Sequence, residues 1–153
     1  MLSLSKKTGY GLIAMTHLAT LADEEVCSAR ELSSRYGMPA SLLMNVLKEL
    51  AAGGFVQSVR GPHGGYRLAR EPKTITLGQL IGVLDRPIEL AECLRAHGRG
   101  VDINCKIRGR CPIVDPINRV QQRLIDFLGG VKLSELVRPT FVLPIEEGAA
   151  ACL

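Results

Sequence analysis

The stretch Arg60-Gly61-Pro62-His63-Gly64-Gly65-Tyr66-Arg67-Leu68-Ala69 contains a glycine-rich turn between two short limbs. Glycine allows positive φ and proline presets φ at the first turn position, so this composition favours a tight turn. An arginine stands on each limb, and the apolar run at residues 54–59 precedes the turn. The pattern predicts a β-hairpin wing that lays cationic side chains along a phosphate backbone. An ordinary surface hairpin is the alternative.

Two helices are predicted well before this hairpin. Ser28, with Glu31 three positions later, predicts a capping box for a short helix that runs to about Tyr36 and ends at Gly37. An earlier helix is expected over residues 5–21. Its apolar residues recur with a helical period: Tyr10, Ile13, Ala14, His17, Leu18 and Leu21.

A third helix is expected to begin at Pro39 or Ala40 and to end at Gly53-Gly54. Its expected buried stripe consists of Leu43, Val46, Leu47 and Leu50. A helix, a helix-turn-helix and a hairpin together make residues 1–70 a winged helix-turn-helix DNA-binding domain. The fold class is therefore mainly α with a small β-hairpin wing.

The remaining chain divides into four segments. Residues 71–91 are expected to be a connecting helix, capped by Thr76. Residues 92–111 read as a cysteine-rich sensor loop, because they combine glycines, five cations and three of the five cysteines. Residues 112–138 are expected to form a dimerisation helix and a short C-terminal helix, and residues 139–153 a flexible tail.

The long C-terminal helix has one apolar face. Pro112 fits its first turn, and the expected stripe is Ile113, Ile117, Val120 and Leu124, with Phe127 near its end. Such a face outside a small domain needs a partner, so we expect a homodimer. A dimer of helix-turn-helix units reads a pseudo-palindromic operator in double-stranded DNA.

Composition narrows the class of protein. The net charge of +4 favours an anionic partner, and no apolar run approaches the length of a membrane span. The N-terminus lacks a signal-peptide pattern, which indicates a cytoplasmic protein with reduced thiols. We expect no enzyme and no small-molecule substrate, because nothing resembles a nucleophile–base pair or a phosphate-binding loop.

Several short stretches make the chain similar to the Rrf-type family of bacterial winged-helix repressors, which includes regulators of the IscR, NsrR and CymR types. The resemblance covers roughly residues 2–137 and implies a repressor. It is carried by Leu4-Ser5-Lys6 with Tyr10, Ser33 to Gly37, Leu47, Leu50, Gly53-Gly54-Phe55-Val56, Arg60-Gly61-Pro62, Gly64-Gly65-Tyr66, Leu80-Ile81, Cys93, Cys105, Cys111 and Leu133-Ser134-Glu135-Leu136.

Cys93, Cys105 and Cys111 are candidate metal ligands, since thiolates are soft ligands suited to iron–sulfur clusters or zinc. The resemblance implies an iron–sulfur cluster, with 2Fe–2S preferred over 4Fe–4S. The residue three positions after the last cysteine, often histidine in the family, is Val114. The fourth ligand therefore stays open between Asp115, His97 and a residue of the partner's first helix.

Two other functions remain open from the sequence. The three loop cysteines suit a cluster-free regulator that senses thiol or disulfide state, and they also suit a small iron–sulfur electron-transfer protein. Cys27 reads as a small buried residue, Cys152 as incidental and His17 as a core histidine. The helix-turn-helix with a basic wing favours DNA binding. The candidate DNA-binding residues are Ser41, Met44, Asn45, Lys48, Arg60, His63 and Arg67.

Overall fold

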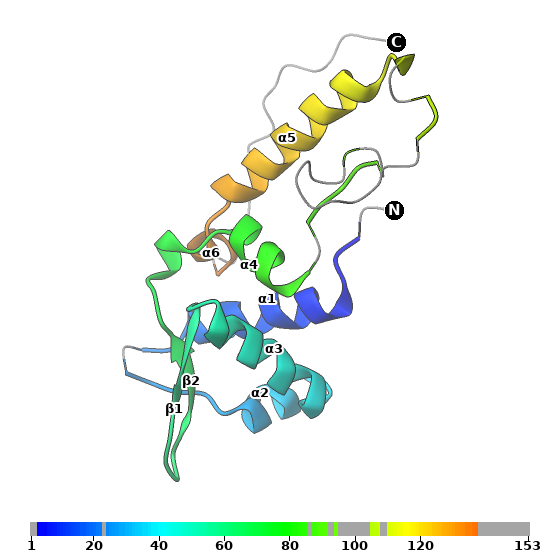
Figure 1. Ribbon diagram of the computed structural model, residues 1–153. Coiled ribbons are helices and arrows are strands. Elements are labelled where there is room, and N and C mark those ends of the chain that lie inside the picture. Colours follow the sequence, from blue (N-terminus) through cyan, green and yellow to red (C-terminus); the bar gives the residue numbers. More distant parts are fainter. Residues whose placement is uncertain are drawn as a thin grey trace.

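The computed structural model describes residues 3–22, 24–85, 87–91, 94, 105–107 and 110–137. Nine elements are assigned along these residues (Figure 1): α1 (Lys6–Leu18), α2 (Ala29–Tyr36), α3 (Ala40–Ala52), β1 (Val56–Val59), β2 (Gly65–Leu68), a 3₁₀ turn (Pro72–Thr74), α4 (Leu77–Leu84), α5 (Val114–Gly130) and α6 (Leu133–Leu136). The predicted class is confirmed: helices dominate, and β1 and β2 pair as an antiparallel hairpin. Cys93, His97, Cys152 and the tail at 139–153 lie outside the described residues.

The predicted capping box of α2 is present. The Ser28 hydroxyl accepts from the Glu31 backbone N–H, and the Glu31 carboxylate accepts from the Ser28 N–H at 2.7 Å. Thr76 caps α4 in the same way with Gln79. Each box satisfies backbone donors that a helix start otherwise leaves unpaired, so these two starts are fixed by local sequence.

Two predicted helix boundaries are wrong. The first helix ends at Leu18, short of residue 21, because the Thr20 hydroxyl and backbone N–H both donate to the His17 carbonyl and close the helix end. The last long helix begins at Val114, so Pro116 rather than Pro112 occupies its first turn. Proline is tolerated at either place, since the first turn lacks acceptors for its N–H groups.

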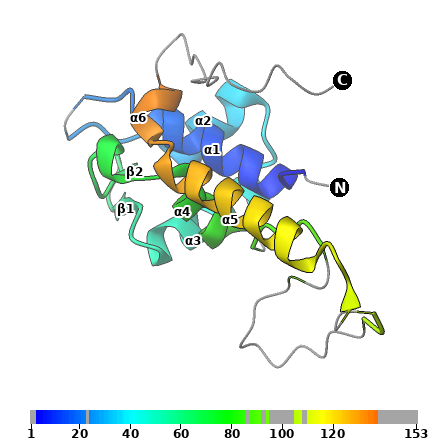
Figure 2. The same cartoon turned by 90° about the horizontal axis from the view of Figure 1, so that it is seen from above.

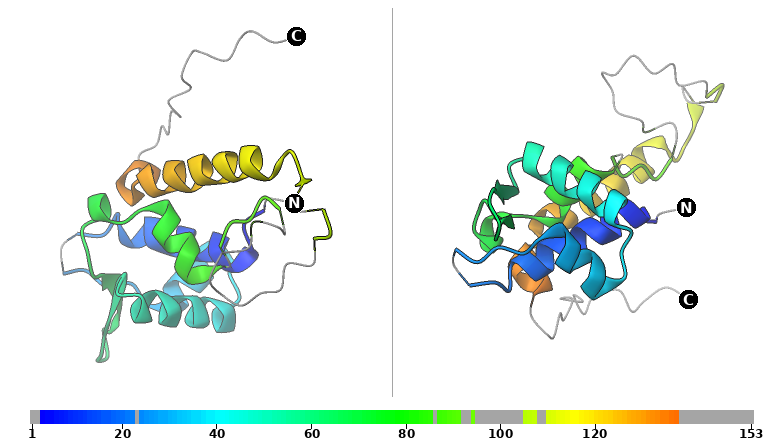
Figure 3. Two further views of the ribbon diagram at one scale, coloured as in Figure 1. Left: turned by 45° about the horizontal axis from the view of Figure 1, so that its top comes forward. Right: turned by 90° about the horizontal axis from the view of Figure 1, so that it is seen from below.

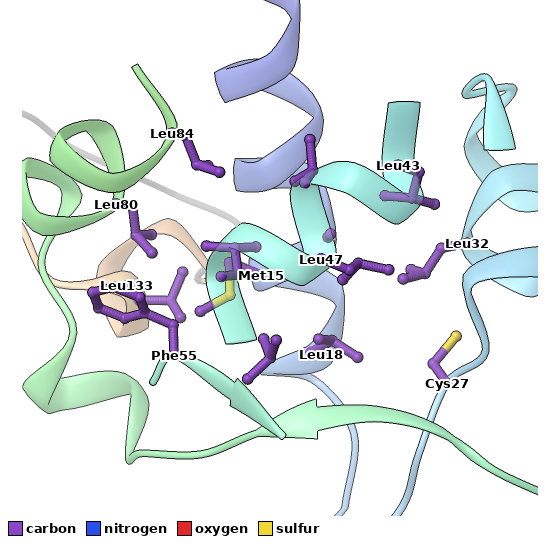
Figure 4. Close-up of a cluster of buried hydrophobic side chains, with 14 of the residues drawn as sticks. Met15, Leu18, Cys27, Leu32, Leu43, Leu47, Phe55, Leu80, Leu84 and Leu133 are labelled. Atoms are coloured by element: carbon purple, nitrogen blue, oxygen red, sulfur yellow. The ribbon is translucent and has the colours of Figure 1, made fainter. Parts of the chain in front are cut away.

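One core joins α1, α2, α3 and α4 with the hairpin and α6 (Figure 4). The α3 stripe predicted from the sequence is fully buried. The α1 stripe is partly wrong: Met15 is 0% exposed, whereas Ile13 is 37% exposed. Thr8 is also fully buried, because its hydroxyl donates to the Asp85 carboxylate at 2.9 Å. The buried face of α1 therefore includes the polar residue Thr8, with its partner Asp85, and excludes the apolar residue Ile13.

The chain returns to this core after α5. Leu133 of α6 is fully buried, and its backbone N–H donates to the Ile75 carbonyl at 2.9 Å. The Leu77 N–H donates to the Val131 carbonyl, also at 2.9 Å. These bonds join the segment at the start of α4 to the segment between α5 and α6. The end of α5 is therefore anchored to the same core that holds the hairpin.

α5 packs on α4 at the end of the molecule opposite the hairpin (Figures 1 and 3), and it lies across α4 when seen from above (Figure 2). The predicted α5 stripe divides into two. Ile117 and Leu124 are half-buried, whereas Ile113, Val120 and Phe127 are exposed. No helix in the described part of the chain is long and apolar enough to cross a membrane.

Candidate DNA-binding surface and cysteine segment

The polar face of α3 is open to solvent. Ser41, Met44, Asn45 and Lys48 are all exposed, as the sequence predicted for a recognition helix. The opposite face is anchored in the core by the leucine and valine stripe. Burial of that stripe fixes the rotation of α3, so its four candidate side chains are presented together on one outward face.

Two glycines of the hairpin that follows α3 allow its turn and its close contact with a neighbouring segment. Gly61 has φ of +126°, a conformation that L side chains rarely adopt. A Cβ on Gly65 would lie 2.7 Å from the backbone of Cys27. Gly65 comes this close to Cys27 because its neighbour Tyr66 pairs with Cys27. The Cys27 N–H donates to the Tyr66 carbonyl at 3.0 Å, and the Tyr66 N–H donates to the Cys27 carbonyl at 2.9 Å. The α1–α2 connection is therefore joined to the outer edge of β2.

The three candidate residues of the hairpin differ in their surroundings. Arg60 and His63 are exposed at the turn, and Arg60 makes no ion pair with any described residue. Arg67 is half-buried and already paired: its guanidinium donates to the Glu24 carboxylate and to the Gln57 side-chain oxygen. The hairpin and α3 lie at the same end of the molecule (Figures 1 and 3), so the structure brings the two groups of candidates to one end.

Sequence reasoning missed four residues near these candidates. Gln57 faces Arg67 across the hairpin, which the register of the two strands would have shown. Glu24 has no sequence signal, because its partner lies 43 residues away. Arg30 and Arg35 are exposed cations on α2, the first helix of the helix-turn-helix. The first helix of this motif crosses the DNA backbone, so exposed arginines there were a usable signal.

The prediction that Cys27 is a buried residue is confirmed, since it is 7% exposed. Burial raises the pKa of its thiol, and the neighbouring Glu31 carboxylate raises it further. His17 is only half-buried, and its Nδ1 lies 3.0 Å from the Tyr36 hydroxyl. Burial lowers the pKa of His17, and Arg35 adds to this effect. Cys27 is therefore packed in the core, and its thiol ionises less readily than that of an exposed cysteine.

Cys105 and Cys111 are half-buried and both thiols are free. Cys111 lies two residues before Ile113, the N-cap of α5, and Asp115 is exposed in the first turn of that helix. Among the described residues no three histidine, cysteine or acidic side chains gather into a metal site. Cys105 and Cys111 supply two thiol donors among these residues, and thiolates are the usual ligands of iron–sulfur clusters.

Asp85 connects the end of α4 to the start of α1. This residue ends α4, and its carboxylate accepts hydrogen bonds from the Ser5 backbone N–H at 3.1 Å and from the Thr8 hydroxyl at 2.9 Å. Lys7, which precedes Thr8 in α1, pairs with Glu49 of α3 at 2.9 Å. The start of α1 therefore contacts both the end of α4 and the recognition helix.

A family model described as "Rrf2: Iron-dependent Transcriptional regulator" matches residues 4–139. The chain belongs to the Rrf2 family. The HTH-type transcriptional regulator IscR of Aliivibrio salmonicida is 32% identical to it over 136 residues, which are 89% of this chain and 77% of that protein. IscR of Vibrio atlanticus is 31% identical over 146 residues, which are 95% of this chain and 81% of that protein.

Solved structures of regulators share this fold. CymR, the global cysteine regulator of B. subtilis, is 28% identical with a TM-score of 0.70, and the match covers 90% of this chain and 97% of CymR. IscR of T. potens is 27% identical with a TM-score of 0.65, covering 89% of this chain and 86% of that protein. This Rrf2 protein is therefore a DNA-binding transcriptional regulator and not an enzyme.

Proposed function

We propose that this Rrf2 protein is a homodimeric repressor whose affinity for a pseudo-palindromic operator depends on an iron–sulfur cluster held by Cys93, Cys105 and Cys111. The observation that carries the proposal is the match of residues 4–139 to a family model described as that of an iron-dependent transcriptional regulator. Cys105 and Cys111 are free and partly accessible, whereas Cys27 is buried in the core. The proposed place of action is the cytoplasm, where a regulator meets chromosomal DNA.

Each α3 is proposed to lie in a major groove, with the wing along the neighbouring backbone or minor groove. Asn45 is suited to pair with adenine through two hydrogen bonds, and Lys48 is suited to contact phosphate. Ser41 and Met44 lie on the same exposed face and extend the contact. The wing contributes Arg60, His63 and Arg67.

The dimer seam is proposed on the outer face of α5. Ile113, Val120 and Phe127 recur every seven residues and are 63%, 53% and 46% exposed. Seven residues are close to two helical turns, so the three side chains form one stripe along the helix. A second copy of the chain would cover this stripe and set the distance between the two recognition helices, which must match half-sites about 34 Å apart.

The three cysteines are proposed to hold the cluster, with 2Fe–2S preferred over 4Fe–4S. When bound, the cluster supplies a group that responds to iron supply and oxidation. Its fourth ligand is proposed to be a non-cysteine group: Asp115, His97 or a residue of the partner's α1. Such a ligand is exchangeable, which makes the occupancy of the site sensitive to conditions.

A cluster-free thiol sensor is the second candidate. Two observations favour it: Cys105 and Cys111 are both free and half-buried, and the similar structure of B. subtilis CymR is named as that of a cysteine regulator. A disulfide switch needs only two of the three cysteines and no iron. The two candidates therefore differ in metal content and in the number of essential thiols.

Anaerobic purification followed by an absorbance spectrum and iron and sulfide analysis distinguishes the two candidates. The cluster proposal predicts a visible chromophore with stoichiometric iron and sulfide. Replacing any one of Cys93, Cys105 or Cys111 by alanine should abolish the chromophore, whereas the matched control Cys27→Ala should keep it. A colourless protein after anaerobic reconstitution would overturn the proposal and leave the thiol switch.

A further inference from the structure

Arg67 on β2 is engaged within the free protein. Its Nη1 donates to the Glu24 carboxylate, and its Nε donates to the Gln57 side-chain oxygen at 3.3 Å. The Arg67 side chain is 28% exposed, while that of Glu24 is 84% exposed. The carboxylate that pairs with this guanidinium thus stands largely in water. Exposed pairs of this kind are held weakly.

The backbone of the turn that carries Glu24 is fixed by several contacts of its neighbours. Glu24 has φ of 70°, and it is the single non-glycine residue with positive φ in the described part of the chain. The Glu25 N–H donates to the Ala22 carbonyl at 3.1 Å, and the Glu25 carboxylate accepts from the Ala22 N–H at 3.0 Å. Just beyond, the Cys27–Tyr66 bridge fixes the segment to β2. Unfavourable φ values persist only where surrounding contacts impose them, and such positions cluster at functional sites.

A carboxylate and a phosphate offer the guanidinium group the same kind of partner, namely two anionic oxygens matched to its fork of N–H donors. Glu24 therefore occupies Arg67 in the way a DNA phosphate would. Arg60, on the other limb of the hairpin, has no acidic partner among the described residues. The two arginines of the wing thus differ in the free protein. Arg60 is available to contact phosphate, whereas the charge of Arg67 is neutralised by Glu24.

We propose that Glu24 competes with DNA phosphate for Arg67, which makes the α1–α2 turn an additional, affinity-limiting part of the DNA-binding surface. Glu24 lowers the affinity for DNA in general, because Arg67 must leave it before it can contact phosphate. The inference rests on the proposed role of Arg67 in DNA binding.

The test measures binding of the whole chain to a short fluorescent duplex of random sequence across a salt series. Glu24→Gln should bind several-fold more tightly at low salt, and its salt slope should steepen by about one charge, since one more cation is free to displace counterions. Glu24→Asn should behave alike, because asparagine tolerates positive φ. The matched control is Asp126→Asn, which removes the same charge from an exposed position on α5.

The Arg67→Ala variant separates competition by Glu24 from the DNA contact of Arg67. In a protein that already carries Arg67→Ala, Glu24→Gln should change the affinity for DNA no more than Asp126→Asn does. If Glu24→Gln bound random DNA as wild type does, or more weakly, competition would be refuted, and the weaker result would mean that Glu24 orients Arg67 for DNA. If Arg67→Ala alone bound as wild type, the proposed contact of Arg67 would itself fail, and the inference with it.

Discussion

At the scale of single residues, the exposed face of α3 carries two side chains suited to different tasks. Asn45 offers the donor and acceptor pair that adenine requires, whereas Lys48 offers a point charge for phosphate. Asn45→Ala should therefore weaken binding to a selected operator by about 1–3 kcal/mol and leave binding to random duplex unchanged. Lys48→Ala should weaken both alike and reduce the salt slope by about one. Fluorescence anisotropy over a salt series measures both quantities.

Both side chains are exposed, so neither variant should shift the urea midpoint of unfolding. That measurement is the control for folding. An equal loss of affinity for operator and random duplex in Asn45→Ala would show that this residue contacts the backbone and does not read a base.

Single residues also show which features of the site could be predicted from the sequence. The exposed set on α3 was predictable, because the buried leucines on the opposite face fix a helical period. The turn of the wing was predictable from its glycines and proline. The pairing of Arg67 with Glu24 was not, since it depends on how the α1–α2 connection meets the edge of β2. Local patterns identify exposed residues, whereas tertiary contacts decide which of them are already engaged.

At the scale of elements, the starts of α2 and α4 follow from capping boxes that a reader of the sequence can recognise. The inward face of α1 does not follow from its pattern. Thr8 is buried for its bond to Asp85, and Gly11 faces α4 so closely that a Cβ would lie 2.2 Å from Leu84. Both features depend on α4, which lies some 70 residues away in the chain. Amphipathic period therefore identifies a helix more reliably than the exact side on which it packs.

The exposed stripe of α5 makes a prediction about assembly. Val120→Glu would place an unpaired charge within the proposed seam of both subunits, which costs several kcal/mol. Sedimentation should show a monomer, and binding to a full operator should fall to that of a half-site. Ile125→Glu is the control, because Ile125 is also exposed on α5 but lies about 140° around the helix from Val120. A stable Val120→Glu dimer would place the seam elsewhere.

At the scale of the whole molecule, the proposed DNA-binding end and α5 lie at opposite ends of one body (Figure 3). Asp85, at the end of α4, accepts hydrogen bonds from the start of α1, and Cys111 lies just before the start of α5. Lys7 links the same end of α1 to α3. The proposed sensor would act on the DNA-binding surface through these contacts, and such coupling further requires that they adopt two arrangements which the sensor biases.

The most direct test of control by a cluster is the operator affinity of the same anaerobic protein before and after removal of its iron by a chelator. The affinity of the wild type should change at least about tenfold, or 1.4 kcal/mol. The Cys111→Ala variant should have the cluster-free affinity throughout, and Cys27→Ala should behave as wild type. Equal operator affinity of the iron-loaded and iron-free wild type would contradict control by a cluster.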